Sequence, residues 1–92
     1  MTETIHHIDL EVINELGLHA RVAARIAEIV QKFDCEVVLC KNEIQAEADS
    51  VLSLLSLDAP QGTVLKIQAR GLQAIEALAS LEQLFKNKFG EV

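Results

Sequence analysis

Positive charge is scarce in this sequence: eight lysine and arginine residues face fourteen aspartate and glutamate residues, giving a formal net charge of −6. Nucleic acids and anionic membrane surfaces both select for basic patches, so this balance argues against either as the main partner. No apolar run approaches the roughly 20 residues that span a bilayer, and residues 1–12 lack the basic start and apolar stretch of a secretory signal. We therefore expect a cytoplasmic protein without membrane insertion.

Cysteine is also scarce. Cys35 and Cys40 lie five positions apart in CEVVLC, so their side chains point to opposite faces if the segment is a strand. A disulfide between them is not expected, and the lack of a C-x-x-C pair or a second cluster argues against a metal or redox site. His6 and His7 face opposite ways on a strand and cannot both bind one metal without distortion. We expect two reduced cysteines, no metal and no cofactor.

The distribution of apolar residues predicts an α+β fold. Half of the 92 residues are apolar, which is enough for one core and too few for two domains, and no repeat or linker is visible. The predicted strands are residues 5–13, 35–40, 44–48 and 63–71, and the predicted helices are residues 20–33, 51–57 and 72–85. The predicted helices are apolar on one side, and the predicted strands alternate apolar and polar residues. This pattern implies helices over one face of a sheet whose other face is exposed to solvent. We expect a single domain over residues 1–92.

Two of these elements carry detailed expectations about the core. In the first helix, the side chains expected to face the sheet are Ala23, Ile26, Ala27, Val30 and Phe33. Along the last strand, the alternation is expected to shift phase once, around Leu65. That shift would place Val64, Ile67 and Ala69 together on one face.

His19 stands directly before the first helix, in the stretch GLHAR. Gly17 can bend the chain in conformations closed to other residues, and Leu18 can enter the core just before the turn. His19 would then lie at or next to the helix N-cap, where unpaired N–H groups and the helix dipole favour a phosphate. Arg21 adds a full positive charge and a planar donor fork.

This arrangement suits an imidazole that accepts and returns a phosphoryl group. A neutral imidazole is nucleophilic, and a phosphoimidazole is a good phosphoryl donor. On the residues alone, however, a simpler interpretation is favoured, in which His19 is a near-cap residue and Arg21 a solvated helix charge.

Ser50 precedes the short apolar run VLSLLSL, a position typical of an N-cap. Such a short helix cannot bury every side chain, so Leu54 and Leu57 should face the sheet. The apolar side chains left partly exposed would be Val51, Leu52 and Leu55. Exposed apolar groups beside a charged site often mark a contact surface, but a purely core-facing role fits these residues as well.

GLHAR followed by a helix rich in small residues resembles the active-site motif of the HPr family, the phosphocarrier proteins of the bacterial phosphotransferase system. EADSVLSLLSLDAPQG is similar to the family's second signature, a serine that opens a short apolar helix followed by a glycine-bearing turn. The resemblance covers nearly the whole chain. It implies an open-faced β-sandwich, a four-stranded antiparallel sheet with three helices on one face in the order βαββαβα.

The resemblance also implies roles for individual residues. His19 would take a phosphoryl group from Enzyme I on Nδ1 and pass it to an Enzyme IIA-type acceptor, with Arg21 beside the phosphohistidine. Ser50 would match the regulatory serine that HPr kinase/phosphorylase phosphorylates in some bacteria. The residues of the implied docking surface are Ala20, Ala24, Val51, Leu52 and Leu55. The protein would be a monomeric carrier and not an enzyme.

Three positions depart from the family pattern. Val22 stands where the family usually has proline, and Glu28 and Gln31 stand where many relatives carry lysine. Valine should preserve the fold, because proline in the first helical turn only removes an N–H that is unpaired anyway. Without those lysines the surface around the site carries less positive charge, so the identity of the partner stays open. The similarities of FDCEVVL and AEADSVLSLLSLD to the nitrogen-related NPr branch leave it open as well. The alternatives are an NPr-type regulator or an HPr-like binding module controlled by phosphorylation at Ser50.

Overall fold

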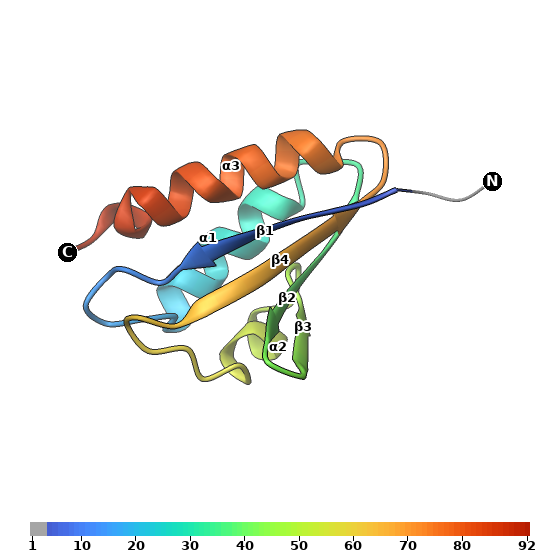
Figure 1. The fold of residues 1–92 in the computed structure, drawn as a ribbon. Coiled ribbons are helices and arrows are strands. Elements are labelled where there is room, and N and C mark those ends of the chain that lie inside the picture. Colours follow the sequence, from blue (N-terminus) through green and yellow to red (C-terminus); the bar gives the residue numbers. More distant parts are fainter. Residues whose placement is uncertain (1–3) are drawn as a thin grey trace.

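Four antiparallel strands form one sheet, and three helices cover one of its faces, as the computed structural model of residues 4–92 shows (Figure 1). In chain order the elements are β1 (Ile5–Glu11), α1 (Ala20–Val30), β2 (Glu36–Lys41), β3 (Ile44–Glu47), α2 (Val51–Leu55), β4 (Val64–Arg70), α3 (Ala74–Lys86) and a 3-10 turn, η1 (Lys88–Gly90). The expected α+β open-faced sandwich is confirmed. Residues 1–3, part of the segment screened for a secretory signal, lie outside the described residues.

The sheet has the strand order β1-β4-β2-β3, so β4 lies in the interior between β1 and β2. Ile67 of β4 pairs with Ile8 of β1 on one side and with Leu39 of β2 on the other. This row of apolar side chains crosses three strands on the helix-covered face. The opposite face carries many charged side chains: in the row of Ile5, Arg70 and Glu36, the Arg70 guanidinium donates to Glu36 Oε2 at 2.7 Å.

The alternation along β4 is regular, so the expected shift of phase around Leu65 is wrong. Leu65, Ile67 and Ala69 are buried, whereas Val64 is 57% exposed. Val64 is apolar, but the period of two along a strand places it on the open face, opposite Glu11 of β1.

The helices are shorter than their apolar patterns predict. α1 ends at Val30 because the hydrogen bonds that follow span three residues and not four, as in a 3-10 turn. The Phe33 N–H donates to the Val30 carbonyl at 3.2 Å. Phe33 still packs against the core. α3 begins at Ala74, two residues after its expected start, because the Gln73 N–H donates to the Asp34 carbonyl at 2.9 Å. α2 stops two residues early.

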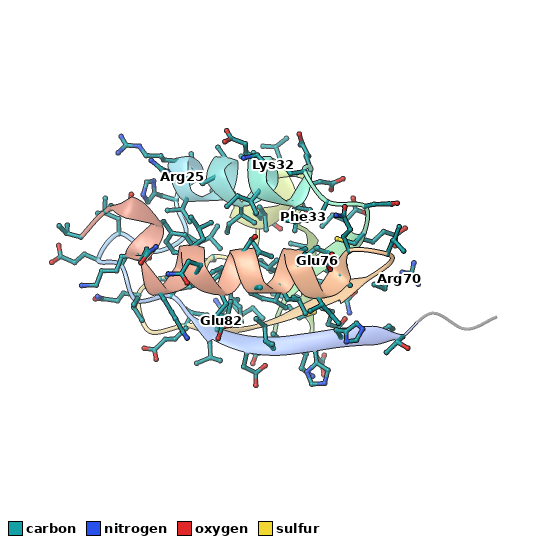
Figure 2. The ribbon with its side chains drawn as sticks, turned by 90° about the horizontal axis from the view of Figure 1, so that it is seen from above. Arg25, Lys32, Phe33, Arg70, Glu76 and Glu82 are labelled. Carbon is teal, nitrogen blue, oxygen red and sulfur yellow. The ribbon has the colours of Figure 1, made fainter. Side chains whose placement is uncertain are left out.

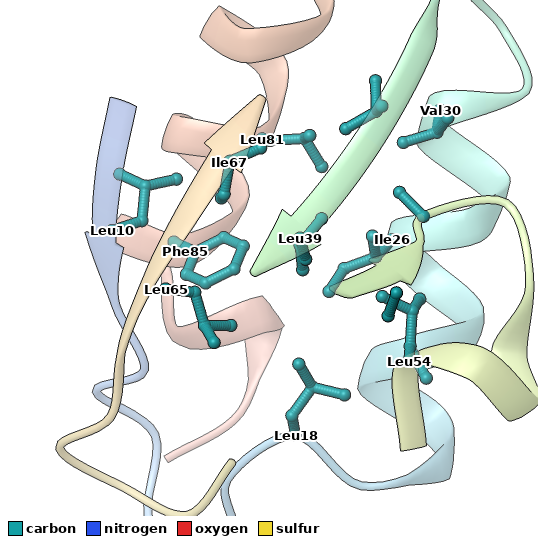
Figure 3. Close-up of a cluster of buried hydrophobic side chains, with 14 of the residues drawn as sticks. Leu10, Leu18, Ile26, Val30, Leu39, Leu54, Leu65, Ile67, Leu81 and Phe85 are labelled. Carbon is teal, nitrogen blue, oxygen red and sulfur yellow. The ribbon is translucent and has the colours of Figure 1, made fainter. Parts of the chain in front are cut away.

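The core lies between the sheet and the helices. Figure 3 shows its centre, with Leu10, Leu18, Ile26, Val30, Leu39, Leu54, Leu65, Ile67, Leu81 and Phe85 labelled. Leu54 and Leu57 are buried, as expected, while Leu52 is 82% exposed and Leu55 37% exposed. α2 thus contributes one face to the core and turns the other to solvent.

Both cysteines have free thiols. Cys40 is buried, and Cys35 is half-buried where the chain enters β2. Burial raises the pKa of the Cys35 thiol, and the neighbouring Asp34 and Glu76 carboxylates raise it further. A higher pKa leaves less of the reactive thiolate at neutral pH, which suits an inert side chain.

Among the helices of residues 4–92, none is both long and apolar enough to cross a membrane.

The loop before α1 is held by a close approach of two backbone segments. Gly17 has a φ of +70°, and a Cβ there would lie 2.8 Å from the Ala59 carbonyl oxygen and 2.9 Å from the Pro60 Cα. The next residue, Leu18, donates its N–H to that same carbonyl at 2.9 Å. Glycine at position 17 therefore lets the loop before α1 lie directly on the loop after α2.

Replacing Gly17 with alanine should lower the free energy of unfolding by about 2–4 kcal/mol, because left-handed strain and crowding add. Gly62 is a matched control: its φ is +93°, but a Cβ there would meet no atom within 4 Å. Gly62→Ala should lose only about 1–2 kcal/mol, from strain alone. Urea denaturation of both variants would measure the difference, and equal losses would contradict the role assigned to the close approach.

Candidate functional site

His19 is the N-cap residue of α1, as expected. Its backbone is extended, with φ −91° and ψ −178°, and its carbonyl accepts the Ala23 N–H at 2.9 Å. The side chain makes no capping hydrogen bond, and the first turn of α1 contains no acidic residue. The imidazole therefore stands beside the positive end of the helix dipole without blocking the N–H groups of the first turn.

The imidazole is held through one nitrogen only. His19 Nε2 lies 2.9 Å from Glu91 Oε1 and 3.0 Å from Glu91 Oε2. An ionised carboxylate can only accept, so in the neutral form of the ring the proton lies on Nε2. Nδ1 has no hydrogen-bond partner within residues 4–92. The His19 side chain is 30% exposed, so in the neutral ring Nδ1 is the nitrogen available to an incoming group.

Asn14 holds the Glu91 carboxylate from the other side. Its Nδ2 donates to Glu91 Oε1 at 2.8 Å and to the Gly17 carbonyl at 2.8 Å. Asn14 is fully buried, whereas the Glu91 side chain is 16% exposed. Asn14, Glu91 and His19 therefore form a connected polar chain that runs from the protein interior to the surface.

These contacts favour the ionised form of Glu91. The hydrogen bond with His19 is the largest cause that lowers the pKa of the Glu91 carboxyl below its ordinary value of 4.5, followed by the hydrogen bond from Asn14. The charges of His19 and Arg21 add smaller effects in the same direction, and partial burial opposes them. Glu91 is therefore a carboxylate at neutral pH.

A left-handed turn brings Glu91 to the site. Lys88, Phe89 and Gly90 have φ values of 55°, 56° and 78°. Phe89 is 1% exposed, and its ring packs edge-on against Phe85 with the centroids 4.7 Å apart. The buried Phe89 ring thus anchors a turn that two of its three residues adopt at a steric cost.

Two further contacts hold the residues on either side of Glu91. The Glu15 N–H donates to the Val92 carbonyl at 2.8 Å. Gly90 lies against Arg25 of α1: a Cβ on Gly90 would be 3.5 Å from the Arg25 Nη1 atom. Figure 2 shows Arg25 projecting from α1.

The other residues singled out in the sequence lie around this cluster or on α2. Arg21 is exposed in the first turn of α1, Val22 is buried beneath it, and Ala20 and Ala24 are exposed. On α2, which packs against α1, Leu52 and Leu55 face solvent and Val51 is half-buried. Ser50 is the N-cap of α2, and its Oγ accepts the Ser53 N–H at 3.2 Å.

Sequence reasoning missed Asn14 and Glu91. Glu91 is separated from His19 by 72 positions, so no spacing rule joins them. The one available signal for Asn14 was an amide residue at the end of an apolar strand, next to a glycine turn. Within residues 4–92, no group of three or more histidine, cysteine, aspartate or glutamate side chains is placed to hold a metal ion.

Replacing Glu91 with glutamine should destabilise the protein at about pH 7 and make a smaller difference at about pH 3. The folded-state pKa of Glu91 lies below the unfolded value, so the carboxylate contributes stability above the unfolded pKa of 4.5 and loses it as the pH falls through the folded pKa. Urea unfolding of both proteins at the two pH values is the measurement. Glu82→Gln, in an exposed pair with Lys86, is the control, and a Glu91→Gln effect that persisted unchanged in acid would contradict the prediction.

Known proteins resemble this chain over most of its length. The family model described as "PTS HPr component phosphorylation site" matches residues 7–87. Phosphocarrier protein NPr of Escherichia coli (strain K12) is 45% identical over 83 residues, covering 89% of this chain and 92% of that protein. Phosphocarrier protein HPr of Neisseria meningitidis serogroup A is 35% identical over 82 residues, with coverages of 89% and 92%.

Solved structures agree as well. HPr-C-His from Thermoanaerobacter tengcongensis superposes with a TM-score of 0.90 at 34% identity, covering 95% of this chain and 98% of that one. An HPr dimer from the same organism superposes with a TM-score of 0.76 at 36% identity, covering 89% and 94%. The chain therefore belongs to the HPr family of phosphocarrier proteins of the bacterial phosphotransferase system.

Proposed function

We propose that this protein accepts a phosphoryl group from Enzyme I on His19 Nδ1 and passes it to an Enzyme IIA-type acceptor. The observation that carries the proposal is the state of the imidazole at the N-terminus of α1. Nε2 is bound to Glu91, and Nδ1 is left without a partner among the described residues. The protein is then a carrier, which takes a group and gives it up, and it needs no cofactor of its own.

The surroundings of Nδ1 suit a phosphoryl group. The first-turn N–H groups of α1 and the helix dipole favour the charged phosphoryl oxygens. Arg21 is exposed two residues after His19, and its guanidinium can approach those oxygens as a planar donor fork. Val22 takes the position of the usual proline without disturbing the helix, and its N–H is retained.

The docking surface comprises Ala20, Ala24, Val51, Leu52 and Leu55. Small exposed side chains on α1 allow a partner to approach His19 closely, and the exposed leucines of α2 supply apolar contact area. Arg21 and Arg25 place positive charge beside this surface on a chain of net charge −6. A partner with a matching apolar patch rimmed by acidic groups fits these features.

The comparisons favour the nitrogen-related branch for this carrier. Identity to the NPr of Escherichia coli is 45%, against 35% for the HPr of Neisseria meningitidis. Glu28 and Gln31 are exposed on α1, so the lysines of many relatives are absent from its surface. A monomer keeps the docking surface open for transient partners, and we propose it as the transferring form. Nucleic acid is not a partner in this proposal.

The alternative function, a binding module controlled at Ser50, stays a prediction. The Ser50 hydroxyl already accepts the Ser53 N–H, which fits a structural cap. A phosphate at that position would add about two negative charges next to the exposed Leu52 and weaken binding of an acidic partner. Incubation with HPr kinase/phosphorylase and ATP, with Ser50→Ala as the control, tests it directly.

Incubation with phosphoenolpyruvate and Enzyme I should add one acid-labile phosphoryl group to the protein and none to His19→Ala. The alanine variant should remain folded, because the partly exposed His19 contributes one interaction with a carboxylate, worth about 1.5–3 kcal/mol. Intact-mass measurement before and after acid treatment reads the result. If Enzyme I proven active on another carrier adds nothing to this protein, the proposed function is wrong.

Leu52→Asp should raise the KM for phosphoryl transfer between this protein and Enzyme I by about tenfold or more, because a charge would replace an apolar contact. Leu72→Asp is the matched control, because Leu72 is 84% exposed and Leu52 is 82% exposed. Leu72 lies just before α3, where the Gln73 N–H donates to the Asp34 carbonyl beyond the C-terminal end of α1. Steady-state transfer kinetics of both variants separate the two positions. Equal losses would place the docking surface elsewhere.

A further inference from the structure

Asn14 carries an unsatisfied buried atom. Its Nδ2 makes two hydrogen bonds, but Oδ1 has no partner among residues 4–92, and the residue is fully buried. Burying a polar atom without a partner is unfavourable, so an apolar residue would suit the core better. What Asn14 provides in exchange is a donor aimed at Glu91 Oε1.

The turn that delivers Glu91 carries a second cost. Lys88 and Phe89 are non-glycine residues in the left-handed region, at φ 55° and 56°. Unfavourable backbone that the surrounding structure maintains is common at functional sites. Two independent costs thus converge on the placement of one carboxylate against His19 Nε2.

We propose that Glu91 is the counter-ion of the phosphorylated His19 ring and that Asn14 is a positioning residue that holds Glu91 in place. The inference rests on the proposed transfer to His19 Nδ1. It gives the Nε2 side of the ring, which faces away from the phosphoryl group, a direct role in phosphoryl transfer.

The electron balance shows what the counter-ion does. As Nδ1 bonds to phosphorus, the donor's bond to phosphorus breaks and the donor leaves with that electron pair. Nε2 keeps its proton, so the ring becomes a positively charged phosphoimidazolium. In the next step the Nδ1–phosphorus bond breaks and its electron pair stays on Nδ1. The ring therefore leaves as a neutral imidazole. A ring without the Nε2 proton would have to leave as an imidazolate anion, a much poorer leaving group.

Glu91 has the right position to keep that proton on the ring. Its two oxygens lie 2.9 and 3.0 Å from Nε2, and a charge-assisted hydrogen bond to a cationic ring is stronger than one to a neutral ring. Among residues 4–92, three other charged groups lie near the pair. Arg21 of α1 acts on Glu91 through space, and Arg25 of α1 lies against Gly90. Glu15 donates its N–H to the Val92 carbonyl. Only His19 and Asn14 form hydrogen bonds with the carboxylate within the described residues.

The test follows the Nε2 proton in the phosphorylated protein. Protein with ¹⁵N-labelled histidine is phosphorylated with phosphoenolpyruvate and Enzyme I, and the Nε2 shift of His19 is recorded by NMR between about pH 6 and pH 10. In Glu91→Gln and Glu91→Ala, the phosphorylated ring should bind this proton about 3–10-fold more weakly, which moves the midpoint down by about 0.5–1 pH unit. Transfer to an Enzyme IIA acceptor should slow in parallel on the alkaline side.

Two further variants separate the counter-ion from a general charge effect. Glu15→Gln removes a neighbouring exposed carboxylate and keeps the backbone bond to Val92, so it should leave the midpoint unchanged. Asn14→Ala should lower the midpoint in the wild-type background and add nothing in Glu91→Ala, because Asn14 acts through Glu91. If Asn14→Ala does not fold, Asn14→Ser, which keeps a polar group, replaces it.

The outcomes are distinguishable. Normal phosphorylation with coincident midpoints for wild type and Glu91→Gln overturns the inference and leaves the carrier function standing. An equal shift in Glu15→Gln also overturns it, because any nearby charge would then suffice. A persistent effect of the Asn14 substitution in the Glu91→Ala background overturns the positioning role. A wild-type protein that takes up no phosphoryl group overturns the proposed function and the inference together.

Discussion

Burial of Leu18 is the constraint on which the site depends. Its side chain lies in the core, and its N–H donates to the Ala59 carbonyl, so the loop before α1 is tied to the loop after α2. Successive side chains of an extended backbone point opposite ways. Because Leu18 points inward and His19 has an extended conformation, the imidazole must point outward, at the start of α1. The burial of one leucine side chain thereby sets the direction of the His19 imidazole.

Much of this could be predicted from local sequence. The position of His19 follows from a glycine turn, a core-directed leucine and a helical period, all within a few residues. The burial of Leu54 and Leu57 with Leu52 exposed follows from the helical repeat in the same way. These features can be predicted because they depend on the geometry of neighbouring residues in the chain.

The rest required the tertiary structure. Val64 looks like a core residue by composition, but the register of β4 against β1 places it on the open face. The Asn14–Glu91–His19 chain joins residues up to 77 positions apart, through a turn in which a lysine and a phenylalanine adopt a conformation usually left to glycine. No propensity predicts that turn, because the buried Phe89 stabilises it through contacts with Phe85.

The pairing of His19 with Glu91 has a consequence for how the molecule forms. During synthesis the histidine is made together with the helix it caps, whereas its carboxylate partner follows 72 positions later in the chain. Contacts between such distant positions form late, after the loop-closure entropy has been offset by the core. The site is therefore completed late in folding, and a protected Nε2 proton reports that the segments around His19 and Glu91 have both reached their native positions.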